Sequence, residues 1–197
     1  MEKVSCTLTD YLVRKGVITV DKSCIYQYGF QIGLEVSLNT LISILIAAFL
    51  HMEWETLVFF IVFTVLRSYA GGLHMETYLG CLICSCLSLM GLLLIVKYID
   101  CPSLFSTGMI FVSLILVKVL SPVLDINRPV SDKDLLKFAK RLNYSIVGIA
   151  FLSIVLFLLQ LNRMLLMVSV TIVFMVCILA FGKVKYKNSV RKVKQGD

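Results

Sequence analysis

Residues 67–81 read RSYAGGLHMETYLGC and separate two long apolar segments. The apolar run before them stops at Arg67, the Gly71-Gly72 pair breaks the helical pattern, and His74 precedes Cys81 by seven residues. Glycine adopts backbone conformations that other residues avoid, so we expect the chain to turn here. Cysteine acyl chemistry needs a nucleophile and a base, and this stretch supplies a candidate for each.

The composition is that of an integral membrane protein. The 197-residue chain is 59% hydrophobic and 16% charged, whereas soluble domains are about 45–50% apolar and about 25% charged. The net charge of +7 does not indicate nucleic acid, because most basic residues flank the apolar segments. The seven cysteines are an odd number and several lie in apolar segments, which argues against a disulfide framework.

The apolar segments predict an all-α fold. A membrane-spanning helix needs about 20 apolar residues, or somewhat fewer where flanking groups reach the interface. Before the first such segment, apolar residues at helical spacing predict one or two amphipathic helices at the membrane surface. The expected domains are amphipathic helices over 1–33, a transmembrane domain over 34–183 and a basic tail over 184–197. We expect a polytopic membrane protein with about six transmembrane helices, at roughly 35–52, 54–70, 79–98, 104–122, 144–161 and 163–182.

The distribution of basic residues predicts the orientation of these helices. Lysine and arginine collect in the N-terminal region, after the second span, after the fourth span and in the tail, whereas Lys97 and Arg163 fall on the other side. The positive-inside rule then places both termini and the 67–81 stretch in the cytoplasm. The residues that carry this prediction are Lys3, Arg14, Lys15, Lys22, Arg67, Arg128, Lys133, Lys137, Lys140, Arg141, Lys183, Lys185, Lys187, Arg191, Lys192 and Lys194.

The spacing of His74 and Cys81 excludes a straight helix between them if they act together. Seven residues of helix would separate them by roughly 10 Å along the axis, beyond the roughly 2.6–3.2 Å of a hydrogen bond. We therefore expect one helix to end near Tyr69, residues 70–77 to form a turn or re-entrant segment, and the next helix to begin near Cys81. A helix start favours a thiolate, and backbone N–H groups around 80–82 would bind an oxyanion.

Other interpretations of the same cysteines stay open. Cys81-Leu-Ile-Cys84 matches the C-x-x-C pattern of membrane thiol oxidoreductases, although Cys101 stands alone on the outer side as an electron relay. A zinc site formed with His74 and Cys86 is disfavoured, because Cys84 and Cys86 are expected to point away from the face of Cys81 on a helix. No metal or other cofactor is therefore expected. A noncatalytic peptide transporter or scaffold is the third class that remains.

The sequence resembles the AgrB family, the accessory gene regulator protein B peptidases of Gram-positive quorum sensing. The family motif is an arginine, then a glycine, a histidine two residues after it and a cysteine seven after that, which Arg67, Gly72, His74 and Cys81 match. Residues 121–129, SPVLDINRP, are similar to a proline-containing segment of the family that ends in a basic residue and proline. The resemblance covers nearly the whole chain, although basic residues around position 128 are fewer than some members carry.

The resemblance implies a cysteine endopeptidase in the cell membrane of a Gram-positive bacterium. Its substrate would be an AgrD-like propeptide with an amphipathic leader, an internal cysteine and an acidic C-terminal tail. By analogy, His74 deprotonates Cys81, the thiolate attacks the carbonyl before the tail, and the substrate's own cysteine then takes the acyl group to form a thiolactone. The expected partners are this propeptide and the lipid bilayer, with a homodimer left open and no nucleic acid.

Further residues have expected supporting roles. Arg67 would hold a substrate carboxylate, steady the transition state or simply end the second span, and Glu76 would orient His74. Basic residues after the fourth span suit the acidic tail, although topology and anionic lipid also explain them. The supporting set is Arg67, Gly71, Gly72 and Glu76, and the set expected to bind the tail is Arg128, Lys133 and Lys137.

Overall fold

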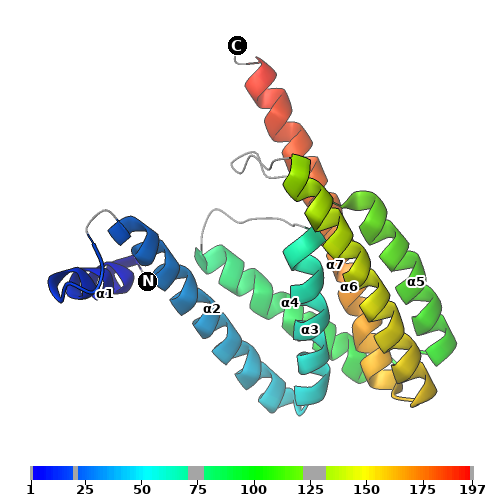
Figure 1. Ribbon diagram of the computed structural model, residues 1–197. Helices are drawn as coiled ribbons and strands as arrows, with labels where there is room; N and C mark the ends of the chain where they lie inside the picture. Colours follow the sequence, from blue (N-terminus) through cyan, green and yellow to red (C-terminus); the bar gives the residue numbers. More distant parts are fainter. Residues whose placement is uncertain (1, 20–21, 71–77, 122–131, 196–197) are drawn as a thin grey trace. The chain divides into compact units, whose positions relative to one another are not determined.

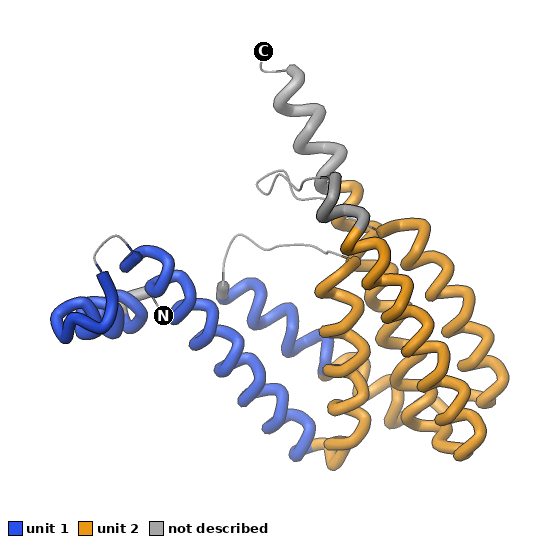
Figure 2. The backbone as a smooth tube through the Cα atoms, viewed as in Figure 1, with its two compact units in different colours: residues 1–49, 75–89 blue, residues 50–74, 90–197 orange. Residues whose placement is uncertain are grey.

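The computed structural model describes residues 2–19, 22–70, 78–121 and 132–195, with the side chains of 4–19, 22–70, 79–121 and 137–184. All secondary structure in these residues is helical (Figure 1). Two compact units are distinguished in Figure 2, and each is described by itself: residues 1–49 with 75–89, and residues 50–74 with 90–197. The helices are α1 (Glu2–Arg14), α2 (Ser23–Leu50), α3 (Glu53–Ala70), α4 (Tyr78–Tyr98), α5 (Ser103–Leu120), α6 (Asp132–Leu158) and α7 (Asn162–Gln195).

Helix α1 exposes its apolar residues and buries two of its polar ones. Its apolar stripe of Val4, Leu8 and Tyr11 is exposed, whereas Ser5 and Thr9 are buried. The Thr9 hydroxyl is satisfied locally, because it donates to the backbone carbonyl of Ser5 at 2.8 Å. An exposed apolar stripe at helical spacing suits a helix that lies in a membrane interface, as the sequence predicts for this region.

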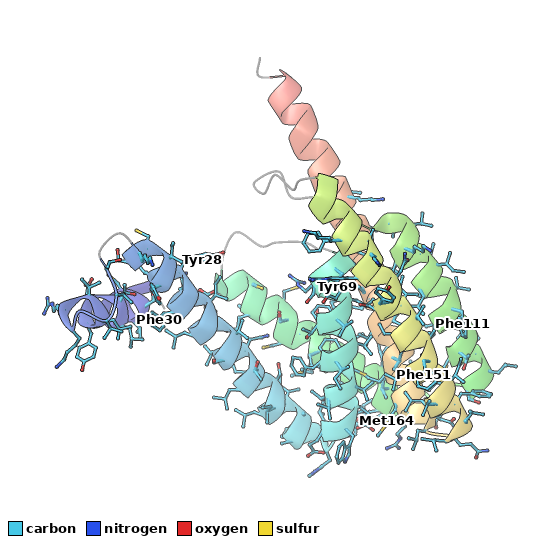
Figure 3. The ribbon with its side chains drawn as sticks, viewed as in Figure 1. Tyr28, Phe30, Tyr69, Phe111, Phe151 and Met164 are labelled. Carbon is cyan, nitrogen blue, oxygen red and sulfur yellow. The ribbon has the colours of Figure 1, made fainter. Side chains whose placement is uncertain are left out.

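Helix α2 runs without a break from Ser23 to Leu50. Ile25 and Tyr28, which the sequence places in a surface helix, therefore belong to the same helix as the span expected at 35–52. Figure 3 labels Tyr28 near the start of this helix, where its side chain is exposed. Hydropathy detects only the apolar part of a helix, and this one starts well before its apolar part.

A polar stripe follows one side of α2 into its apolar part. The Gln31 amide donates to the Glu35 carboxylate at 3.1 Å, and the Ser43 hydroxyl donates to the backbone carbonyl of Asn39 at 2.8 Å. The side-chain oxygen of Asn39 is buried and has no hydrogen-bond partner within the described residues. Polar groups in a membrane helix are costly on a lipid-facing side. The stripe, which sequence analysis missed, comprises Gln27, Gln31, Glu35, Asn39 and Ser43 at intervals of four.

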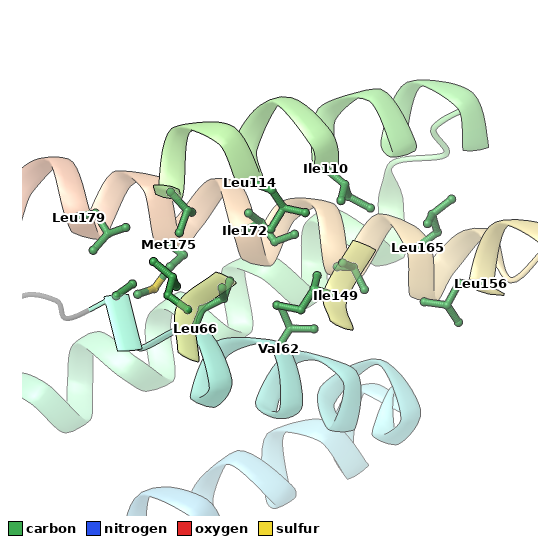
Figure 4. Packing of buried hydrophobic residues seen from close by; sticks show 14 residues of the cluster. Val62, Leu66, Ile110, Leu114, Ile149, Leu156, Leu165, Ile172, Met175 and Leu179 are labelled. Atoms are coloured by element: carbon green, nitrogen blue, oxygen red, sulfur yellow. The ribbon is translucent and has the colours of Figure 1, made fainter. Parts of the chain in front are cut away.

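The second unit contains a bundle of α3, α5, α6 and α7. Helix α7 packs against each of the other three, and α3, α5 and α7 run in one direction while α6 runs in the other (Figure 1). The α7 residues of the main buried cluster alternate at spacings of three and four, which is the pattern of a helix whose apolar seam faces its neighbours. These residues are Leu165, Val168, Ile172, Met175 and Leu179, and all of them except Val168 are labelled in Figure 4.

The outward side of the bundle is apolar as well. Phe111 on α5 and Phe151 on α6, both labelled in Figure 3, are exposed. An exposed phenylalanine is unfavourable in water but not in hydrocarbon. The bundle therefore has the surface of a protein that is surrounded by lipid, and close packing between helices has to hold it together.

Side chains from other helices satisfy the carbonyl groups at three helix ends. Lys97 donates to the carbonyl of Leu50 at the end of α2, and Lys183 donates to that of Val119 in the last turn of α5, both at 3.4 Å. The Ser121 hydroxyl donates to the carbonyl of Ala70, the last residue of α3, also at 3.4 Å. The last four carbonyls of a helix have no partner within it, so such donors stabilise the helix end.

Helix α6 ends by a backbone motif instead. Gln160 has a φ of +56°, in the left-handed region. The Gln160 amide donates to the carbonyl of Phe157 and the Leu161 amide to that of Leu156, each at 3.1 Å. This paired arrangement closes many helices, usually with glycine at the left-handed position. It turns the chain tightly into α7 and so makes α6 and α7 antiparallel neighbours.

Five of the described helices are long and apolar enough to cross a membrane, namely α2, α4, α5, α6 and α7. This agrees with the predicted all-α, multi-pass fold. Helix α3, expected as a further span over 54–70, has the expected bounds but carries Glu53, Glu55 and Arg67 within its 18 residues. Its side chains Val62 and Leu66 are fully buried against the other helices of the bundle.

Packing around α7 predicts a stability difference between two isoleucines. Ile172 is fully buried in the centre of the cluster, whereas Ile115 on α5 is exposed. Replacing Ile172 by alanine is expected to cost about 2 kcal/mol or more, because a cavity remains in the core. Thermal unfolding in detergent micelles measures the difference, with Ile115→Ala as the matched control. Equal losses from both substitutions would show that α7 is not the packed centre of the bundle.

Candidate active site

Arg67 lies in the last turn of α3 and is half-buried. Its guanidinium carbon is 5.6 Å from the ring centroid of Phe63, one turn earlier on the same helix. The negative face of an aromatic ring attracts a guanidinium group and so restricts the direction in which the arginine side chain points. Arg67 is thus positioned at the end of α3, from which the chain continues into 71–77.

Cys81 is the fourth residue of α4 and its thiol is exposed. The expected helix start near Cys81 is therefore confirmed to within one turn. The sulfur is accessible to a reacting partner and is not a packed core thiol.

The position of the helix start shifts the expected oxyanion donors. In a helix that begins at Tyr78, the amide of Leu82 already bonds to the carbonyl of Tyr78. The amides of Tyr78, Leu79 and Gly80 lie in the first turn, where N–H groups have no acceptor within the helix itself. Of the amides expected around 80–82, that of Gly80 lies in this first turn, whereas that of Leu82 is bonded within the helix.

Two more cysteines follow Cys81 on α4. Cys84 is exposed and Cys86 is half-buried. Residues three apart are neighbours on a helix surface, whereas residues five apart lie on different sides. The expectation that both point away from Cys81 therefore holds for Cys86 alone. Cys84 lies one turn from Cys81 on nearly the same side.

Several expected site residues lie outside the described residues: His74, Gly71, Gly72, Glu76 and Arg128. Lys133 lies in α6, although its side chain is not among those described. Arg67 belongs to the second unit and Cys81 to the first, so each is placed only within its own unit. The described helices on either side of His74 end at Ala70 and begin at Tyr78, and α3 and α4 are separate helices as expected.

Basic side chains gather at one end of the bundle. This end, called the basic end below, is where α3 and α5 finish, as the hydrogen bonds to the Ala70 and Val119 carbonyls show. Helix α6 starts there, because it runs opposite to α5 and α7 (Figure 1). The exposed basic residues at this end are Lys118, Lys137, Lys140, Arg141 and Lys183, and Arg67 is half-buried there.

Ser121 is a residue that sequence analysis did not single out for structure. It lies 51 residues from Ala70, and its hydroxyl fixes the end of α5 to the end of α3. The only signal available was its place at the start of the segment 121–129 quoted above. Within the described residues, no group of three histidine, cysteine or acidic side chains is arranged to hold a metal ion.

Comparison with known protein families shows the family to which the chain belongs. The sequence profile of accessory gene regulator B, AgrB, matches residues 5–181. The chain belongs to the AgrB family. The match covers the candidate spans in α2, α4, α5 and α6, all but the last three residues of the span Asn162–Val184 in α7, and the whole of the Arg67–Cys81 stretch.

One curated relative is an AgrB-like protein of Lactiplantibacillus plantarum, 28% identical over 115 residues. The match covers 56% of this AgrB chain and 58% of the relative, so the chain spans little more than half the length of that protein. No solved structure matches the chain.

Proposed function

We propose that this AgrB protein is a membrane-embedded cysteine endopeptidase that removes the C-terminal tail of an AgrD-like propeptide. The observation that carries the proposal is the thiol of Cys81, exposed in the first turn of α4 at the cysteine position of the family motif. An accessible thiol beside the first-turn amides of a helix is suited to acyl transfer, since such amides can bind an oxyanion.

The first step is attack on the peptide bond before the tail. His74 takes the proton of the Cys81 thiol, and the sulfur attacks the carbonyl carbon. Amides of the first turn of α4, from Tyr78 to Gly80, stabilise the negative oxygen of the tetrahedral intermediate. His74 then gives the proton to the departing amine, which leaves with the tail, and the acyl group remains on Cys81 as a thioester.

The second step transfers the acyl group to the substrate's own cysteine. His74, neutral again after the first step, takes the proton of this thiol, whose sulfur attacks the thioester carbonyl; Cys81 leaves as a thiolate that regains the proton from His74, and a peptide thiolactone forms. One thioester replaces another, so the step needs no oxidant and is close to isoenergetic. A thiol within the same peptide has a high effective concentration, and a membrane surface that limits water favours it over hydrolysis.

The basic end suits an acidic tail. Lys137, at the start of α6, is exposed, and Lys140 and Arg141 follow it on the same helix. Arg128 and Lys133, which precede them in the sequence, extend the positive charge. We assign Arg128, Lys133 and Lys137 to binding of the tail, with Arg67 positioning a substrate carboxylate or the transition state and Gly71, Gly72 and Glu76 supporting His74.

The same charges support an orientation. The basic end carries most of the basic side chains described in the bundle, whereas Glu53 and Glu55 lie at the opposite end of α3. We infer that the basic end faces the cytoplasm of a Gram-positive cell and that α3 is a sixth span, so that both termini are cytoplasmic. The 18 residues of α3 are about 27 Å long, close to the roughly 30 Å of the hydrocarbon core.

A second candidate function rests on Cys84. Cys81 and Cys84 are both exposed one turn apart on α4, an arrangement that also fits a thiol oxidoreductase. The two functions differ in what they need from Cys84. Acyl transfer requires one thiol, whereas a dithiol–disulfide cycle requires both.

Substitution of single cysteines separates these functions. Cys81→Ala is expected to abolish cleavage of a co-expressed AgrD-like propeptide, because no nucleophile remains. Cys84→Ala is expected to keep cleavage within about threefold, since its removal is a small change at an exposed position. Cleavage is measured by mass spectrometry of the released tail. Equal loss from both substitutions would favour redox chemistry, and cleavage by Cys81→Ala would favour a scaffold or transporter.

Orientation is tested by thiol labelling of single-cysteine variants in intact cells. Cys81 and Cys101 lie near opposite ends of α4. A membrane-impermeant maleimide is expected to label Cys101 from outside and Cys81 only after the membrane is opened. Labelling of Cys81 in intact cells without labelling of Cys101 would reverse the orientation.

A further inference from the structure

The geometry of α4 places two cysteines at a Cα spacing that suits a disulfide. On a regular helix the Cα atoms of residues three apart lie about 5 Å from one another, inside the range of roughly 4.4–6.8 Å found for disulfides. Cys81 and Cys84 have this spacing, both thiols are exposed, and both are free. Nothing in the proposed acyl transfer uses Cys84, so its place beside the nucleophile has no role in that chemistry.

The neighbouring Cys86 does not share this geometry. Its Cα lies about 8.7 Å from that of a residue five positions earlier on a helix, beyond the reach of a disulfide. Cys84 and Cys86 are only two residues apart, but their side chains leave the helix on nearly opposite sides. Among the three cysteines of α4, Cys81 and Cys84 alone form a suitable pair.

The start of a helix tolerates the adjustment that a disulfide needs. Bonding requires the two Cβ atoms to approach to about 3.8 Å, closer than they lie on an ideal helix. Cys81 lies in the first turn of α4, and the amides of a first turn have no preceding turn to hold them. Tightening of a terminal turn toward a 3₁₀ geometry is common. Pairs in the middle of a helix lack this freedom.

We propose that Cys81 and Cys84 form a reversible disulfide that switches off the peptidase. The proposal rests on the proposed function of Cys81 as nucleophile. The oxidant is a low-molecular-weight disulfide. One cysteine thiolate attacks it, forms a mixed disulfide and releases one small thiolate. The second cysteine then attacks the protein sulfur of the mixed disulfide and releases the other small thiolate.

This exchange balances in electrons and protons. Two cysteine thiols are oxidised, one small disulfide is reduced to two thiols, and the two thiol protons pass to the released thiolates. Cys84 is the resolving thiol when Cys81 attacks first. The bond removes the nucleophile while protecting it from irreversible oxidation, and a reducing thiol restores it.

The test uses the full-length protein in nanodiscs, reduced and then treated with oxidised glutathione. The wild type is expected to lose two hydrogens by intact mass, with peptide mapping showing a Cys81–Cys84 bond. Cleavage of the propeptide should fall at least tenfold and return on reduction. Cys84→Ser should instead retain a glutathione adduct on Cys81. Cys86→Ser is the matched control and should form the same bond as the wild type.

The covalent product decides the outcome, since a glutathione adduct would also stop cleavage. A stable adduct on Cys81 of the wild type, or loss of the internal bond in Cys86→Ser, would overturn the pairing. Cleavage by each variant in its reduced form shows that it is folded. If the bond forms but cleavage continues unchanged, the switch is excluded and Cys81 is not the nucleophile, whereas absence of the bond leaves the peptidase proposal intact.

Discussion

The hydroxyl of Ser121 donates to the carbonyl of Ala70, where α3 ends and the stretch containing His74 begins. Inside a membrane no water is available for a free carbonyl, so each helix end needs a donor from the protein or a place at the interface. Lys97 and Lys183 meet the same need at the ends of α2 and α5. The contact of Ser121 with Ala70 fixes where α3 and α5 stop relative to each other, at the end of the bundle from which the chain continues toward the candidate active site.

A contact of this kind explains the position of Lys97 on the side of the membrane that is expected to have few basic residues. Counted by position, it is one of two basic residues that fall on the side opposite the others. In the structure its ammonium group is bound to the Leu50 carbonyl, where a cation is favoured by the negative end of the α2 dipole. Its position thus has a structural cause, and it does not weaken the orientation that the remaining basic residues support.

The sequence predicted the helices wherever hydropathy changes sharply. Pro102 separates α4 from α5, and both helices lie within two residues of their expected bounds. The prediction was less complete for α2 and α6, whose helices begin about twelve residues before the apolar part, because hydropathy does not register helical turns made of polar residues.

The contact of Ser121 with Ala70 could not be predicted, since it joins residues 51 apart and no local pattern encodes it. Cys81 could be singled out because the spacing of the motif can be read directly from the sequence. Its exposure and its proximity to Cys84 on the helix surface required the structure of α4.

The central claim is that the thiol of Cys81 carries the acyl group between the two steps. The most direct measurement is rapid acid quenching of the enzyme with a propeptide whose internal cysteine is replaced by serine, followed by intact mass and peptide mapping. The account predicts a thioester of the tail-less peptide on Cys81 that hydroxylamine removes, because the usual acceptor thiol is missing. Release of the tail without an adduct on Cys81 at any quench time, or an adduct on another residue, would contradict it.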